Sequence, residues 1–186
     1  MKLSKIFLTT VLAMAFAINL SAQDKKVFKY VGSKSCKMCH TTKKQGQMYK
    51  IWQKSKHAQA YEVLASEKAL AIAKERGIEN PQKSGECLQC HVTAYGVKAE
   101  RLGPKFKIEE GVGCEACHGP GSAYKPKKVM KAITAGKIDP ASVGLEKPTE
   151  ETCKKCHNEK SPTFKGFDFE EMYKKIEHKK PAASKS

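Results

Sequence analysis

The chain has 186 residues, of which 35 are Lys or Arg and 19 are Asp or Glu, giving a formal net charge of +16. Only 8% of the residues are aromatic and the mean hydropathy is −0.56, which excludes a protein with several membrane spans. The same figures leave few side chains for a conventional apolar core.

Residues 1–22 have the pattern of a secretory signal peptide. Lys2 and Lys5 form a charged start, Ile6 to Leu20 is apolar, and Ser21-Ala22 supply the small residues that precede a cleavage site. The alternative is an uncleaved membrane anchor, although the apolar run is short for a bilayer span. No later segment is apolar enough to cross a membrane. We therefore expect an exported, periplasmic protein with its signal peptide removed.

A Cys-x-x-Cys-His motif occurs four times and uses all eight cysteines. This spacing is typical of covalently attached c-type haem, because both thiols can add to the vinyl groups of one porphyrin and the next residue then lies under the iron. We expect four covalently bound haem c groups, each with its iron. The predicted attachment residues are Cys36, Cys39, Cys87, Cys90, Cys114, Cys117, Cys153 and Cys156. The predicted proximal iron ligands are His40, His91, His118 and His157.

Paired cysteines also occur in zinc ribbons and in disulfide scaffolds. A zinc ribbon does not need a histidine directly after each pair. A small secreted disulfide scaffold would also use an even number of cysteines, with no reason for the histidines. Because the chain has only six histidines and four of them follow the four cysteine pairs, the haem interpretation is favoured.

The expected core consists largely of porphyrin. After removal of residues 1–22, four haems would have about 41 residues each, too few to wrap each haem in its own apolar pocket. The porphyrins must therefore lie close together and supply much of the buried apolar surface. We predict one mainly α-helical multihaem cytochrome c domain with little or no β structure over residues 23–180, and a disordered tail over residues 181–186. The apoprotein is expected to be largely unfolded.

The positive charge survives processing and haem attachment. Loss of Lys2 and Lys5 with the signal peptide, together with eight propionates and four ferric centres, leaves about +10. This charge favours redox donors and acceptors with acidic docking surfaces, and it is compatible with an anionic membrane surface. Nucleic acid is not an expected partner of an exported protein. The alternative is that scattered lysines only keep the protein soluble.

The first half of the chain contains short helical patterns around the first motif. Met38, between the two cysteines of that motif, is expected to pack rather than to bind iron. Gln45 to Gln53 is helix-like, and Ser55 can cap a second helix. In that second helix His57 would share an apolar face with Leu64.

The remaining helices are marked by caps and turn residues. We expect Glu67 to Arg76 after the cap Ser66, Pro126 to Ala135 with Gly136 as the stop, a helix after Thr149 that carries Cys153 to His157, and a last helix after Asp168.

His57 and His178 are the two histidines outside the motifs. Four irons have eight axial positions and the chain has six histidines, so both are candidate distal ligands. His57 could also be a core histidine on its apolar face. On an ideal helix His178 lies opposite the apolar face, where it would be a surface residue near a helix C-terminus.

The chain resembles the cytochrome c-554 family of tetrahaem electron carriers, whose members accept electrons from hydroxylamine oxidoreductase. The resemblance covers most of residues 33–180. It rests on the four motifs in this order and on Trp52 with His57-Ala58, Cys90-His91 with Tyr95-Gly96, Gly113 to Ser122, and the tail that ends in His178.

The resemblance implies that the haems stack in close pairs within a mostly helical body. It also implies that His57 reaches the fourth haem, that His178 reaches the third, and that the second haem keeps an open distal position. In the family, the distal ligand of the first haem comes directly after the Gly-Pro-Gly-Ser segment, where this chain has Tyr124. Tyr124 could ligate the iron, Met130 could do so, or the position could be vacant with Tyr124 in a structural role.

Two functions follow from these expectations. An electron carrier needs closely spaced haems and docking by charge and shape. An open-haem reductase of a small nitrogen oxide or oxygen species also needs a vacant iron and distal groups that donate protons. No distal acid–base set is recognisable, because all six histidines are candidate ligands. The carrier is favoured over the enzyme, and a role as an assembly surface is the least specific possibility.

Overall fold

The structure is a computed structural model that describes residues 26–181. The predicted signal peptide and residues 182–186 of the predicted tail lie outside the described residues. Within the described range the chain is helical and forms no strand, and an isolated parallel bridge joins Tyr30 to Leu102. No helix in this range has the length and apolar character needed to cross a membrane. The predicted mainly α, small single-domain fold is confirmed.

The described helices are short. The α-helices are α1 (Lys34–His40), α2 (Met48–Gln53), α3 (Glu67–Glu75), α4 (Gly85–His91), α5 (Cys114–His118), α6 (Lys127–Thr134), α7 (Glu150–Lys154) and α8 (Phe169–Lys174). The 3-10 helices are η1 (Lys43–Gln45), η2 (Glu62–Ala65), η3 (Ala99–Arg101), η4 (Ile108–Glu110) and η5 (Pro140–Val143).

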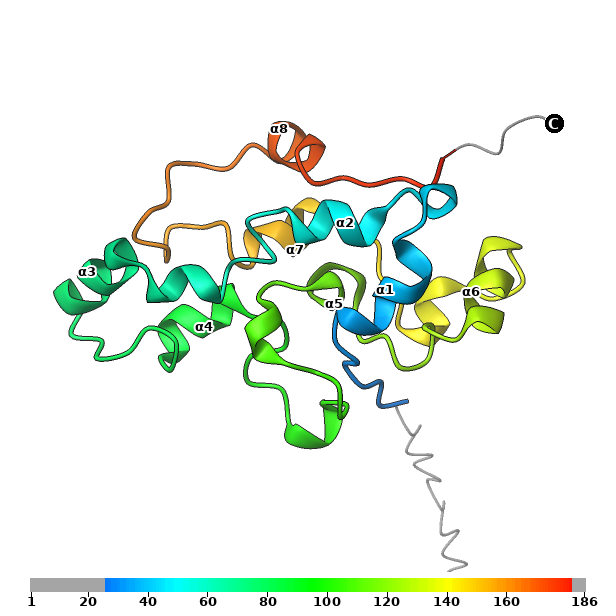
Figure 1. Cartoon of the computed structure of the whole chain (residues 1–186), viewed down its shortest axis with the longest axis horizontal. Coiled ribbons are helices and arrows are strands. Elements are labelled where there is room, and N and C mark those ends of the chain that lie inside the picture. Colours follow the sequence, from blue (N-terminus) through cyan, green and yellow to red (C-terminus); the bar gives the residue numbers. More distant parts are fainter. Residues whose placement is uncertain (1–25, 182–186) are drawn as a thin grey trace, which may run out of the picture.

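The helices are spread along one long axis of the molecule (Figure 1). Helices α3 and α4 occupy one end, α6 occupies the other, and α5, α2 and α7 lie between them. After α8 the chain returns toward the segment between α1 and α2. There a Cβ on Gly46 would meet the Lys179 carbonyl. The C-terminal segment is thus held against the N-terminal part of the fold.

Several predicted helix starts are confirmed. The Ser66 hydroxyl accepts a hydrogen bond from Ala69 N (3.3 Å) at the start of α3, and Asp168 accepts one from Glu171 N (2.8 Å) at the start of α8. Pro126 directly precedes α6. These caps act within one turn of backbone, so the local sequence is sufficient to predict them.

Three local predictions are wrong. The chain after Ser55 forms turns that lead into η2 rather than a second α-helix, although Ser55 Oγ accepts a hydrogen bond from Ala58 N (3.4 Å) as a cap would and also donates one to Trp52 O (2.6 Å). Helix α7 ends at Lys154, so it carries only the beginning of the fourth motif. The Met38 side chain is 87% exposed and does not pack.

The protein-only core is small. The buried apolar residues of the described range are Tyr49, Leu64, Ala73, Leu88, Val92 and Tyr124. Leu64, Leu88 and Val92 form an apolar cluster between η2 and α4, with Tyr61, Cys87 and Ile108 around it. Such a core is too small to offset the conformational entropy of the chain, as expected where bound haem supplies the missing apolar surface.

Candidate haem sites

Each of the first three motifs lies on a short helix, and the fourth begins at the end of α7. Helices α1, α4 and α5 each place their two cysteines three positions apart, on one face of a helical turn. None of the eight cysteines, all within the described range, forms a disulfide. Within residues 26–181, no group of three or more His, Cys, Asp or Glu side chains is arranged to hold a metal ion without a porphyrin. The local geometry therefore fits thioether attachment at each motif.

Cysteines of different motifs lie side by side. The side chains of Cys36 in the first motif and Cys114 in the third share a hydrogen bond. This bond raises the pKa of the Cys36 thiol and lowers the pKa of the Cys114 thiol.

The fourth motif contacts the second, because Cys156 Sγ lies 3.9 Å from Gln89 O and its thiol contacts Cys90. Cys117 of the third motif lies near Cys153 of the fourth, and burial raises the pKa of the Cys117 thiol to about 11. These neighbours link the first motif to the third, the third to the fourth and the fourth to the second.

His57 faces the histidine of the fourth motif. The ring centroids of His57 and His157 are 6.0 Å apart with an interplanar angle of 78°. Two imidazoles on opposite sides of one metal ion, with metal–nitrogen bonds of about 2 Å, place their centroids about 6 Å apart. The two rings therefore fit the two axial positions of one haem iron.

The backbone around His57 is held by a distant glycine. Val112 N donates to His57 O (2.9 Å), and Trp52 Nε1 donates to Val112 O (2.9 Å). Gly111 has a φ of +68°, and a Cβ there would lie 2.7 Å from His57 O. A side chain at Gly111 would displace the turn that carries His57.

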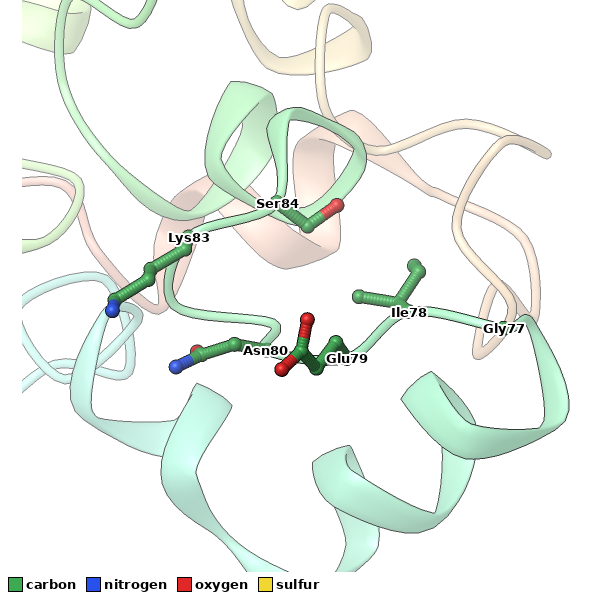
Figure 2. Close-up of a pocket in the computed structure, with 6 residues that line it drawn as sticks. All are labelled: Gly77, Ile78, Glu79, Asn80, Lys83 and Ser84. Atoms are coloured by element: carbon green, nitrogen blue, oxygen red, sulfur yellow. The ribbon is translucent and has the colours of Figure 1, made fainter.

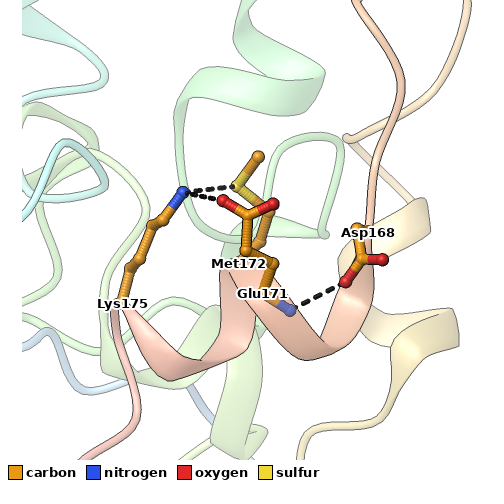
Figure 3. Close-up of polar contacts among 4 residues, drawn as sticks. All are labelled: Asp168, Glu171, Met172 and Lys175. Carbon is orange, nitrogen blue, oxygen red and sulfur yellow. Dashed lines mark hydrogen bonds and ion pairs between the residues drawn. The ribbon is translucent and has the colours of Figure 1, made fainter.

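His178 faces the histidine of the third motif in the same way. Their ring centroids are 6.0 Å apart with an interplanar angle of 65°. Helix α8 ends at Lys174, so the ideal-helix placement of His178 does not apply and its ring turns inward. Figure 3 shows polar contacts at the two ends of α8. Near its C-terminus, Lys175 Nζ donates hydrogen bonds to Glu171 Oε1 (2.7 Å) and Met172 Sδ (3.7 Å).

Backbone carbonyls orient three of the candidate ligands. Nδ1 lies 2.6 Å from Ala60 O in His91, 3.2 Å from Glu146 O in His118 and 3.0 Å from Ile176 O in His178. A proton on Nδ1 donates to the carbonyl and leaves Nε2 free to bind a metal. His40 differs, because its buried Nδ1 has no partner in the described residues.

Burial keeps the imidazoles in the form that binds iron. Desolvation is the main cause that lowers the pKa of His40, His57, His118 and His157. In the His57–His157 pair, the neighbouring His157 lowers the pKa of His57 further. Neutral rings can each offer a lone pair to a metal.

Tyr124 has a structural place beside the first and third motifs. It is buried, and its hydroxyl donates to Gly119 O (2.8 Å). Burial is the main cause that raises the pKa of Tyr124 above the ordinary value of 10.0. Because the hydroxyl is buried and already donates to a backbone carbonyl, the structural role is favoured over phenolate ligation.

Glu115, inside the third motif, binds the backbone of the N-terminal segment. Its carboxylate is buried and accepts hydrogen bonds from Val31 N (2.8 Å), Gly32 N (2.7 Å) and Gly121 N (2.6 Å). We call this set the carboxylate junction. Sequence reasoning missed it, because Glu115 and its first two partners are more than 80 positions apart. In the sequence, the sign of this junction is the glutamate that lies between the two cysteines of the third motif.

Two cavities differ in their relation to the motifs. The first, about 430 Å³, lies between α3 and α4 and is lined by Ile78, Gly77 and four polar residues, with no cysteine or histidine (Figure 2). The second, about 500 Å³, is lined by His157, Phe164 and Phe167 among others. The Phe167 ring stacks on His157 at 4.9 Å. The second cavity adjoins a predicted haem ligand and the first does not.

The comparisons with known proteins agree with this geometry. A family model described as "Cytochrome c554 and c-prime" matches residues 35–119. "Cytochrome c-554" of Nitrosomonas europaea is 30% identical over 177 residues, which covers 79% of this chain and 73% of the relative. The chain belongs to the cytochrome c-554 family. It is a c-type cytochrome and binds haem c with its iron covalently. No solved structure matches the chain significantly.

Proposed function

We propose that this c-type cytochrome is an exported tetrahaem protein that carries electrons between redox proteins. The observation that carries the proposal is the proximity of cysteines of different motifs, which links the first motif to the third, the third to the fourth and the fourth to the second. Haems attached at neighbouring thiols lie close enough to exchange electrons with one another. A continuous series of one-electron centres is what a carrier needs.

The proposed axial ligands are two imidazoles at the third haem and two at the fourth. His118 and His178 would hold the third, and His157 and His57 would hold the fourth. The support is the separation of 6.0 Å between the ring centroids in both pairs. His40 and His91 would be the histidine ligands of the first and second haems.

The hydrogen-bond partners of the ligand histidines would influence how strongly each ferric iron is stabilised. Haem c supplies the reversible one-electron chemistry when it is bound. The Nδ1 contacts of His91, His118 and His178 with backbone carbonyls orient the rings and raise their basicity. A more basic ligand favours the ferric iron. The buried Nδ1 of His40 has no such partner in the described part, so the first haem is expected to differ from the third.

Mass spectrometry and a redox titration of the purified exported protein test the proposal. We expect a mass increase of four haems and loss of residues 1–22. The titration should show rapid and reversible reduction in several one-electron steps. Zinc in place of haem, or fewer than four haems on protein with intact motifs, would contradict the proposed cofactor content.

Single substitutions test the ligands. His57→Ala and His178→Ala should each convert one low-spin ferric haem to high spin, measured by electron paramagnetic resonance. Gln59→Ala is the matched control for His57, because Gln59 is an exposed residue two positions away. An unchanged spectrum in either histidine variant would remove that residue from the ligand set.

The reductase alternative has its own readout. Carbon monoxide binding to the ferrous protein would reveal an accessible iron, and steady consumption of nitrite or nitric oxide under excess reductant would reveal turnover. A carrier is expected to show reduction without sustained turnover.

A further inference from the structure

Positive charge is distributed unevenly over the molecule. From Lys26 to Tyr61 the chain has nine lysines and no acidic residue, and from 122 to 138 it has five lysines and no acidic residue. From Glu62 to Glu110 it has eight acidic and eight basic residues, so this segment is neutral. A uniform coat of solubilising lysines would not produce this contrast.

The two lysine-rich segments lie in the same half of the molecule. The first segment contains α1 and α2 and the second contains α6, whereas the neutral segment contains α3 and α4 at the opposite end (Figure 1). We call the exposed lysines of α1, η1 and α6 the basic face. These lysines are Lys34, Lys37, Lys43, Lys44, Lys127, Lys128 and Lys131.

The charge of the basic face is not cancelled internally. All seven lysines are exposed, and none forms an ion pair with a carboxylate of the described residues. The nearby carboxylates Glu110 and Glu115 are turned inward, where they accept backbone hydrogen bonds from Ser33 and Gly32. Two propionates of a haem at the first motif would offset only two of these charges.

Two lysines of the basic face lie on α1, the helix that also carries the most exposed haem attachment cysteine. Cys39 is exposed, whereas the other seven cysteines are partly buried. Met38 beside it is 87% exposed and offers a large apolar contact directly after Lys37 and one helical turn after Lys34. Exposed apolar side chains ringed by charge are typical of protein docking sites. A membrane-binding surface would need a broader apolar face with bulky side chains.

Resting on the electron-carrier function proposed above, we propose that the basic face docks an acidic electron-transfer protein and that electrons cross this interface at the first motif. Complementary charge would steer the encounter, and contact with Met38 would bring the partner next to the thioether edge at Cys39. The neutral end at α3 and α4 would make no such encounter. One end of the series of motifs is thus specialised for an acidic partner.

The test uses the full holoprotein and reduced flavodoxin, an acidic one-electron flavoprotein, as the probe. Stopped-flow reduction would be measured for the wild type, for Lys43→Gln/Lys44→Gln/Lys128→Gln, and for Lys68→Gln/Lys74→Gln/Lys83→Gln. The last triple removes the same charge from exposed lysines in and near α3. All six positions lie outside the haem motifs.

We expect the basic-face triple to lower the second-order rate constant about tenfold at low salt, and the control triple to change it less than about twofold. The difference should disappear at high ionic strength, where exposed charges are screened. Equal slowing by both triples would overturn the proposal, because net charge alone would then explain the rate. Binding to phosphatidylglycerol vesicles that only the basic-face triple abolishes, with unchanged flavodoxin rates, would also overturn it in favour of a membrane surface.

Reduction by dithionite separates this result from the proposed function. If dithionite reduces all three proteins equally while flavodoxin distinguishes them, the docking site is supported. If dithionite reduces all three equally and flavodoxin does not distinguish them, the docking site is wrong and the carrier function stands. Failure of dithionite to reduce haem in the wild type would overturn the carrier function and the docking proposal together.

Discussion

The carboxylate junction and the apolar cluster hold the two halves of the molecule in different ways. At the junction, Glu115 accepts hydrogen bonds from Val31 N and Gly32 N, which join the N-terminal segment to the third motif, and a third from Gly121 N in the loop after that motif. In the cluster, Leu64, Leu88 and Val92 exclude water between η2 and the second motif. The first half relies on directional polar contacts and the second on apolar burial.

The difference shows how a chain with a small core can still order several haem motifs. A buried carboxylate satisfied by three N–H groups specifies one arrangement of two distant segments. An apolar cluster contributes more free energy but less geometric selectivity. Because both regions adjoin haem motifs, each should depend on bound haem for most of its stability.

Removal of all four haems is the change with the largest expected effect on both regions. The apoprotein should show little helical circular dichroism at 25 °C and no cooperative thermal transition, because the protein-only core is too small. The holoprotein at the same concentration is the control. A cooperative melt of the apoprotein would show that the two regions suffice to fold the chain.

Leu64→Ala weakens the apolar cluster alone. We expect the free energy of unfolding of the holoprotein to fall by about 2–5 kcal/mol, because the substitution leaves a cavity beside Leu88 and Val92. Leu70→Ala is the control, since Leu70 is 48% exposed and should change the value by less than about 0.5 kcal/mol. Equal effects of the two substitutions in denaturant titrations would mean that the cluster contributes no particular stability.

Glu115→Gln alters the carboxylate junction without changing its volume. An amide N–H would then face a backbone N–H, so we expect a loss of about 1–3 kcal/mol in the free energy of unfolding. Glu109→Gln is the matched control, because Glu109 is exposed. An unchanged free energy of unfolding in Glu115→Gln would show that water can replace the hydrogen bonds of the junction at little cost.

Tyr124→Phe tests the smallest contribution, the hydrogen bond beside the junction. Loss of the bond to Gly119 O should lower the free energy of unfolding by about 1 kcal/mol and leave the haem spectrum unchanged. Burial raises the pKa of Tyr124, so the unfolded chain ionises first as pH rises above 10.0 and the wild type loses stability there. The Phe variant should lack this contribution to the alkaline loss. A changed ferric spectrum would instead identify Tyr124 as an iron ligand.

The sequence predicted those parts of the site that depend on local spacing. The eight cysteines and the four motif histidines were found from a five-residue pattern, and the caps Ser66 and Asp168 from a single helical turn. An α-helix after Ser55 was predicted from apolar periodicity, but the chain forms turns there and then the short η2, although Ser55 Oγ does accept from Ala58 N (3.4 Å). Met38 was expected to pack because it is apolar, but its side chain is 87% exposed, since apolar character alone does not specify a packing partner.

By itself, the sequence determined the haem chemistry, the mainly helical class and the family resemblance, because thioether spacing and helix caps are set within a few neighbouring residues. The resemblance also implied that His57 reaches the fourth haem and His178 the third, and the tertiary structure places these rings beside His157 and His118. Only the tertiary structure decided that Glu115 holds a segment more than 80 positions away. Such contacts depend on how distant backbone segments pack together, and no local pattern encodes the partner.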